Sequence, residues 1–313
     1  MTQVLPFCRY IFTVRVLEPL RLPSFAGSLL RGSFGRSLRQ LSCMTHMENC
    51  QDCPLLTNCP YTQIFEIPPP ECHSLQKFSA VPNPYSIEPP QGGTRVLDTG
   101  DEFCFSMVLI GQALSHLPLI ILAWERALAQ GLNKSRSRCQ LVSVHCEGDK
   151  EAIYLAGGKV RPHQPVASPL PTMEDTAVLE FTTPLRLQRH GRNVGLRELD
   201  ARTLLIALAR RYQLLCDTQM RLPPQLDFAA LDEAAQHIDL KAEMRWRDWQ
   251  RYSGRQKQAM PLGGLIGRIN LSGNLAPFIS LLSAGQWLHV GKETVFGLGH
   301  YLLHLSGNTE GSP

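Results

Sequence analysis

Apolar residues recur along the chain with the spacings of strands and helices. Alternation over 8–17 predicts a strand, and a helical period over 27–42, with Leu30, Phe34 and Leu38 on one face, predicts a helix. Four further elements are predicted in the first half: a strand within 75–88, a strand over 102–111, a helix over 117–130 and a strand over 138–146. The first half is thus predicted to have the order β-α-β-β-α-β.

The second half repeats this order after a proline-rich stretch at 157–175, which is typical of a linker. Its predicted elements are strands over 178–187, 239–247, 262–271 and 298–305, and helices over 199–215 and 275–284. Two consecutive β-α-β-β-α-β units predict an α+β fold of two tandem ferredoxin-like (RRM-like) domains. We place the first domain at 1–160, with an insertion at 43–72, and the second at 176–306.

Composition narrows the class of protein. Hydrophobic residues make up 43% and charged residues 19% of the chain, which is enough apolar material for two cores and excludes disorder for most of its length. No apolar run approaches the roughly 18 residues of a membrane span. Arg9 and Arg15 interrupt the N-terminal stretch that a signal peptide would need. We therefore expect a soluble, cytoplasmic protein with no membrane partner.

Four of the ten cysteines, Cys43, Cys50, Cys53 and Cys59, lie close together in the sequence. Four thiolates complete a tetrahedral zinc shell, and the two-residue gap between Cys50 and Cys53 suits such ligands. Because this segment is too short and polar to form a core, a metal would supply its folding free energy. The pattern predicts structural zinc, since four sulfur ligands leave no open position for catalysis. Free thiols, an iron–sulfur cluster, or a shell in which a histidine replaces one cysteine are the alternatives.

The net charge of +4 is concentrated in two segments. Six arginines between residues 1 and 47 are balanced by one acidic residue, and 241–257 carries six basic residues against two acidic ones. Such segments favour a face that binds a polyanion, with solvated surface charge as the alternative. Within 245–257, Trp246, Trp249 and Tyr252 offer stacking faces for unpaired bases, unless the tryptophans pack into the core.

A glycine-rich stretch, GKETVFGLGHY, occupies 291–301. Closely spaced glycines let backbone N–H groups approach phosphate oxygens without a Cβ in the way. The stretch leads into a predicted strand and not into a helix, so a dinucleotide-binding loop is excluded. A plain turn would also explain these glycines.

Four segments together carry a family resemblance: SLLRGSFG at 28–35, the cysteine insertion that ends in CPY at 59–61, RYSGRQ at 251–256, and the glycine-rich stretch at 291–301. With them the chain resembles the CRISPR-associated endoribonucleases of the RAMP superfamily, which cut precursor CRISPR RNA within its repeats. The resemblance covers nearly the whole chain. It implies tandem ferredoxin-like domains and cleavage by the ribose 2′-OH without a catalytic metal, giving 2′,3′-cyclic phosphate and 5′-OH ends.

The resemblance also implies partners and RNA-binding residues. The expected partners are CRISPR repeat RNA, as precursor and as mature guide RNA, and other subunits of a CRISPR effector complex. In related enzymes a hairpin between the middle strands of the second domain grips the RNA stem, and the basic segment 245–257 lies at that place. This basic hairpin, the arginine–glycine motif at Arg31 and the glycine-rich stretch supply the expected RNA contacts: Arg31, Arg36, Arg245, Arg247, Arg251, Arg255, Lys257, Gly291, Gly297, Gly299 and His300.

The catalytic residues are harder to assign. In the family the catalytic histidine, where present, lies on or just after the first helix of the first domain, and this helix carries no histidine here. His46 is the nearest and is our first candidate, with Tyr252 as proton donor and Lys292 or Arg255 stabilising the charge. The remaining candidates are His73, His289 and His300. A non-catalytic RNA-binding subunit of a CRISPR effector complex is the alternative function, and a zinc-stabilised scaffold with no RNA role is the third.

Overall fold

The computed structural model describes residues 4–69, 81–163, 175–248, 250–253, 258–261 and 263–305. The chain forms two compact units. The N-terminal unit comprises Val4–Val166 together with Leu214–Arg221, and the C-terminal unit comprises Ala167–Gln213 and Leu222–Pro313.

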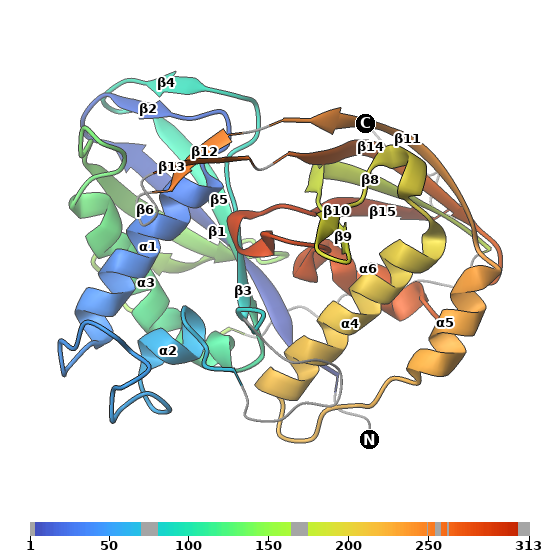
Figure 1. Ribbon diagram of the computed structural model, residues 1–313. Coiled ribbons are helices and arrows are strands. Elements are labelled where there is room, and N and C mark those ends of the chain that lie inside the picture. The colour runs from blue at the N-terminus through green and yellow to red at the C-terminus, as the bar shows by residue number, and fades with distance from the viewer. Residues whose placement is uncertain are drawn as a thin grey trace. The chain divides into compact units, whose positions relative to one another are not determined.

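An antiparallel five-stranded sheet, in the order β3-β5-β1-β6-β7, forms the N-terminal unit (Figure 1). Its strands are β1 (Phe7–Val16), β3 (Tyr85–Glu88), β5 (Glu102–Ile110), β6 (Cys139–Cys146) and β7 (Ala152–Leu155). Its other elements are α1 (Gly27–Ser42), α2 (Pro60–Ile64), η1 (Gly111–His116), α3 (Leu117–Ala129) and the pair β2 (Leu20–Leu22) and β4 (Arg95–Leu97). This unit is a sheet covered by α1 and α3 on its apolar face.

Aromatic side chains form the centre of the N-terminal core. Alternate residues of β1 are buried, and among them Phe12 stacks on Phe105 of β5 with ring centroids 5.0 Å apart. The ring centroid of Trp124 of α3 lies 4.5 Å from that of Phe105, and the ring centroid of Phe34 of α1 lies 5.1 Å from that of Trp124. The period of two in β1 and the helical period in α1 and α3 therefore converge on one core.

The C-terminal unit contains an antiparallel sheet in the order β11-β14-β8-β15. Its strands are β8 (Thr176–Leu185), β11 (Asp239–Arg247), β14 (Gly264–Ser272) and β15 (Tyr301–Leu305). The remaining elements are β9 (Gln188–Arg189), β10 (Arg192–Asn193), η2 (Leu196–Glu198), α4 (Ala201–Gln219), α5 (Phe228–Gln236), β12 (Gln250–Ser253), β13 (Gln258–Pro261), α6 (Ile279–Leu288) and η3 (Thr294–Phe296). Residues of α4, α5, α6 and the sheet share one hydrophobic core.

The expected mixed α+β class with antiparallel sheets is confirmed. The helix predicted over 27–42 has those bounds, whereas the one predicted over 275–284 begins only at Ile279. The elements that the sequence did not predict are short or lie at the periphery: α2, α5, β7, η1, η2, η3, and the pairs β2–β4 and β9–β10. The β12–β13 pair lies where the basic hairpin was expected. Among the described residues, no helix combines the length and apolar character that crossing a membrane requires.

Candidate functional site

The glycine-rich loop, residues 290–300, is joined to the end of β8 by backbone hydrogen bonds. The N–H of Gly299 donates to the carbonyl of Pro184 at 3.0 Å, and the N–H of Lys292 donates to the carbonyl of Arg186 at 2.8 Å. The side chain of Lys292 is exposed. The loop therefore takes its shape from the chain itself and presents a cation at its surface.

Three glycines of this loop adopt left-handed backbone angles, with φ of 93° at Gly291, 90° at Gly297 and 72° at Gly299. A Cβ on Gly299 would overlap the carbonyl oxygen of Val290, and one on Gly291 would overlap that of Arg186. The N–H groups of Gly297 and Gly299 both donate to carbonyls of the chain. These two amides are therefore not available to phosphate oxygens, and the glycines allow the loop to follow its path.

His289 links the end of α6 to the glycine-rich loop. It is fully buried, and its Nδ1 donates to the carbonyl of Leu298 at 3.1 Å, because a carbonyl can only accept. Beside it, Arg211 of α4 donates its Nε–H to the carbonyl of Leu288 at 2.7 Å. Burial lowers the pKa of this guanidinium to about 10, so it stays charged at neutral pH. The hydrogen bond to Leu298 fixes the orientation of the His289 ring.

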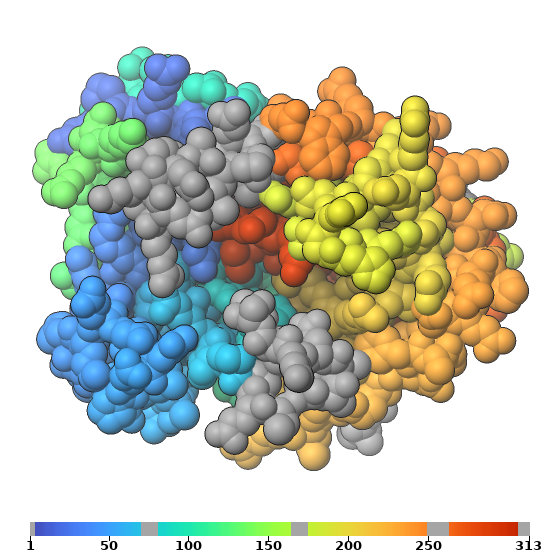
Figure 2. All heavy atoms as spheres, viewed as in Figure 1, coloured from blue at the N-terminus to red at the C-terminus, as the bar shows by residue number. Residues whose placement is uncertain are grey.

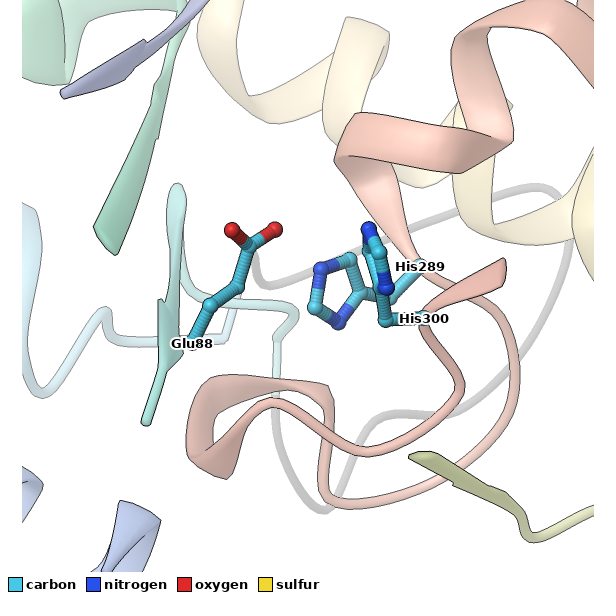
Figure 3. A group of neighbouring side chains, drawn as sticks. All are labelled: Glu88, His289 and His300. Atoms are coloured by element: carbon cyan, nitrogen blue, oxygen red, sulfur yellow. The ribbon is translucent and has the colours of Figure 1, made fainter. Parts of the chain in front are cut away.

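His300, at the other end of the loop, is oriented by two threonines of β8. Its Nδ1 lies 2.5 Å from Oγ1 of Thr182, and its backbone N–H donates to Oγ1 of Thr183 at 2.9 Å. The rings of His289 and His300 lie beside one another, with centroids 5.1 Å apart and planes tilted by 58° (Figure 3). His300 is therefore a half-buried imidazole whose ring is held by a hydroxyl group, a geometry that proton transfer requires.

Two arginines of the N-terminal basic segment are paired with carboxylates inside their own unit. Arg9 donates to both carboxylate oxygens of Glu88, which Figure 3 also labels, at 2.8 and 3.1 Å, and to Glu147 at 2.5 Å. Arg15 pairs with Glu102 at 2.8 Å. The positive charge that the sequence concentrates in 1–47 is therefore partly neutralised by residues far along the chain.

The two arginines of α1 that were predicted to bind RNA lie in different surroundings. Arg31 donates its Nε–H to the hydroxyl of Tyr85 at 3.1 Å, and its Cζ lies 4.1 Å from the ring centroid of Phe65. The ring of Phe65 can approach the helix closely because Gly35 has no Cβ, and a Cβ there would overlap the ring. Arg36 is exposed. Arg31 thus packs within its unit, and Arg36 lies at the surface.

A hairpin occupies the predicted basic segment. Arg245 and Arg247 are exposed on β11, and the backbone of Arg251 and Tyr252 lies in β12, which pairs with β13. Trp246 of β11 is 42% exposed, so it is not a core residue. Four residues that the sequence analysis singled out lie outside the described residues: His73, Trp249, Arg255 and Lys257.

The cysteine segment, residues 43–59, follows α1 and lies at the surface (Figure 2). All four of its cysteines line one cavity of about 20 Å³, which has room for one water-sized group. Arg39 of α1 donates to the carbonyls of Met47 and Glu48 at 2.7 and 2.8 Å. Burial raises the pKa of the Cys50 thiol, and the nearby Arg39 cation opposes this effect. The cavity fits a single ion in position and in donor type.

The spacing of the thiols is nevertheless wider than in a closed zinc shell. Sulfurs about 2.3 Å from a tetrahedral zinc lie about 3.8 Å from one another. Among the described residues, no three of these four Sγ atoms lie within 4.8 Å of one another. His46, in the same segment, is exposed and has a φ of 54°. No hydrogen bond from another described residue orients its ring.

Two family models match the sequence. One, described as an N-terminal domain, covers residues 5–165. The other, described as the CRISPR-associated endoribonuclease Cas6, covers residues 179–301, which include β8, the basic hairpin and the glycine-rich loop. No curated protein gave a significant match to the sequence.

Solved structures match the fold of almost the whole chain. A Cas6 product complex superposes with a TM-score of 0.59 and 18% identity, over 96% of this chain and 100% of that chain. Thermus thermophilus Cas6 superposes with a TM-score of 0.54 and 16% identity, with the same coverage. A partial Cas6-RT-Cas1–Cas2 complex gives 0.58 and 14%, over 99% of this chain and 48% of that chain. At these identities the likeness concerns the fold.

Proposed function

Because the chain belongs to the Cas6 family of CRISPR-associated endoribonucleases, we propose that it cuts precursor CRISPR RNA once within each repeat to release guide RNA. A ribose 2′-OH attacks the adjacent phosphorus and the 5′-oxygen leaves, which gives a 2′,3′-cyclic phosphate and a 5′-OH end. The nucleophile belongs to the RNA, so no metal-activated water is required, and we infer from the family that catalysis is metal-independent. The supporting observation is the glycine-rich loop, which holds an oriented imidazole and an exposed ammonium group.

The reaction requires removal of one proton, donation of another, and stabilisation of added negative charge on the phosphate. His46 and His300 are the candidate proton carriers. The geometry favours His300, because Thr182 orients its ring, whereas His46 is exposed. Lys292 is the proposed charge stabiliser, with Tyr252 of β12 as the second proton carrier.

Single-turnover cleavage of repeat RNA in EDTA tests this assignment. We expect His300→Ala to slow cleavage by about 10²–10⁴-fold, the range that general acid–base groups contribute. His304→Ala is the matched control, since this histidine of β15 is exposed and its ring has Glu180, at 3.2 Å, as its one hydrogen-bond partner among the described residues. His46→Ala measured in parallel decides between the two candidates.

A repeat RNA with one 2′-deoxy nucleotide on the 5′ side of the scissile phosphate tests the reaction class. It lacks the nucleophile and keeps nearly every binding contact, so we expect it to bind normally and remain intact. Cleavage of this RNA at the same bond, or strict dependence on added magnesium, would contradict the mechanism. Tight binding of repeat RNA with no cleavage would instead favour the non-catalytic RNA-binding subunit.

The family also leads us to propose a domain architecture, a structural metal ion and a cytoplasmic location for this protein. We infer two ferredoxin-like domains at 1–160 and 176–306. The strand orders support this: β1 and β5 are central between β3 and β6 in one sheet, and β8 and β14 are central between β11 and β15 in the other. We infer one structural zinc ion held by Cys43, Cys50, Cys53 and Cys59, supported by the cavity they share. The partners would be precursor and guide RNA and other CRISPR effector subunits, in the cytoplasm.

A further inference from the structure

Trp246 is an aromatic residue left half in solvent. Its side chain is 42% exposed, and it is the one exposed aromatic side chain among the described residues. Two positions earlier on the same face of β11, Met244 is 8% exposed and belongs to the core. The apolar face of the strand therefore continues one residue beyond the core. Leaving an indole in water forgoes burial free energy that a bound partner would recover.

The indole of Trp246 is held in place from two directions. Its Nε1–H donates to Oδ1 of Asp248 at 2.7 Å. Gly263 lies directly against the ring, so closely that a Cβ on this residue would be 2.9 Å from both Nε1 and Cζ2 of the indole. A ring with a satisfied polar atom and a restricted orientation loses little conformational freedom when a flat ligand stacks on it.

The charges around this indole favour RNA as the ligand. Arg245 and Arg247 precede and follow Trp246, and both are exposed. Alternation along a strand directs these arginines to the opposite face of β11 from the indole. Since β11 is an edge strand of its sheet, an RNA strand crossing this edge would meet arginines for its phosphates and an aromatic face for a base.

We propose that Trp246 is a stacking platform for one unpaired nucleobase of the repeat RNA, at the base of the β12–β13 hairpin. The inference rests on the proposed function for the identity of the ligand. Every base has a π-face, so this subsite would recognise an unpaired nucleotide and not a particular base. The subsite would therefore distinguish an unpaired from a paired nucleotide at the position of the RNA that lies beside the base of the hairpin.

Binding of uncleavable 2′-deoxy-substituted repeat RNA to the full chain, measured over a range of salt concentrations, tests this subsite. We expect Trp246→Leu to weaken binding by about 5- to 150-fold, the range for loss of one base stack. The slope of log affinity against log salt should stay at its wild-type value, because no phosphate contact is lost. Trp246→Phe should retain most of the affinity. Arg245→Gln is the matched control, and its slope should fall by roughly 0.7–0.9.

A series of RNAs with single abasic positions completes the test. At one particular position of the series, loss of the base should weaken binding to wild-type protein and leave the affinity of Trp246→Leu unchanged, because that base is the one that stacks on the indole. The inference is wrong if Trp246→Leu binds as well as wild type, or if its loss of affinity is equal for every abasic RNA. Failure of wild-type protein to bind any repeat RNA would overturn the proposed function as well, and so is distinguishable.

Discussion

The glycine-rich loop and the cysteine segment are both irregular stretches next to a regular element, yet they are stabilised in different ways. Backbone hydrogen bonds join the glycine-rich loop to Pro184 and Arg186 at the end of β8. The cysteine segment has local turns, such as the bond from the Cys53 N–H to the Cys50 carbonyl at 3.1 Å, and the two bonds from Arg39. Met44 within it is 81% exposed.

This difference indicates where each stretch obtains its free energy of folding. The glycine-rich loop satisfies its polar groups within the chain and buries most of its residues, so its shape needs no ligand. The cysteine segment buries little, and its four cysteines line one cavity. A bound metal would supply what its contacts do not. We therefore expect perturbations of the two stretches to respond differently to metal.

Removing two of the proposed zinc ligands should have the largest effect. We expect the double change Cys50→Ser and Cys53→Ser to reduce zinc content from about one ion per chain to none, and to destabilise the cysteine segment by on the order of 5 kcal/mol or more. Elemental analysis and limited proteolysis between residues 43 and 59 measure the two effects. Cys104→Ser, at an exposed position of β5, is the control. Wild-type protein purified without chelator and free of zinc would refute the metal site.

A methyl group at Gly299 should have the next largest effect, and one that does not depend on zinc. Gly299→Ala adds left-handed strain and an overlap with the Val290 carbonyl, so we expect a loss of about 3 kcal/mol or more in the free energy of unfolding. Gly191 has a similar φ, 78°, but open space around it. Gly191→Ala should cost about 1 kcal/mol. Equal losses in denaturant unfolding would show that the overlap is relieved without cost.

Two glycines of α1 provide the finest comparison, because they lie on one helix. Gly35→Ala would overlap the ring of Phe65, and we expect it to destabilise the N-terminal unit by about 1–3 kcal/mol. Gly32 has no atom within 4 Å of a Cβ, so Gly32→Ala should stabilise the helix by up to about 1 kcal/mol. Thermal unfolding of both variants measures the difference. Opposite signs are the expected result, and the same sign for both would contradict this account of the motif.

Local signals explain which elements could be predicted from the sequence. The bounds of α1 follow from its apolar period alone. The start of α5 also carried a local signal that was missed, since Asp227 caps it by accepting from the N–H groups of Ala229 and Ala230 at 3.1 and 3.0 Å. Strand β7 is short and half exposed, so its pattern is weak. Its place is decided by pairing with β6.

The candidate site was predictable in its residue types and not in their roles. Four cysteines lie within 17 residues of the sequence, and in the structure all four line one cavity. Their grouping could be predicted because residues close in sequence are also close in space. The roles of His289 and His300 were not separable in the sequence. In the structure His289 is buried and bonded to the carbonyl of Leu298, whereas His300 is half-buried and bonded to the hydroxyl of Thr182.

Periodicity and spacing are local properties of the chain, and they predict the order of its main strands and helices and the grouping of the four cysteines. Sequence motifs carry the family resemblance. Only the tertiary structure decided that Arg31 stacks on Phe65, that Gly299 lies against Val290, and that Trp246 remains half exposed. Burial and hydrogen bonding are pairwise properties of residues that folding brings together. No periodicity along the chain specifies which distant residue will be the partner.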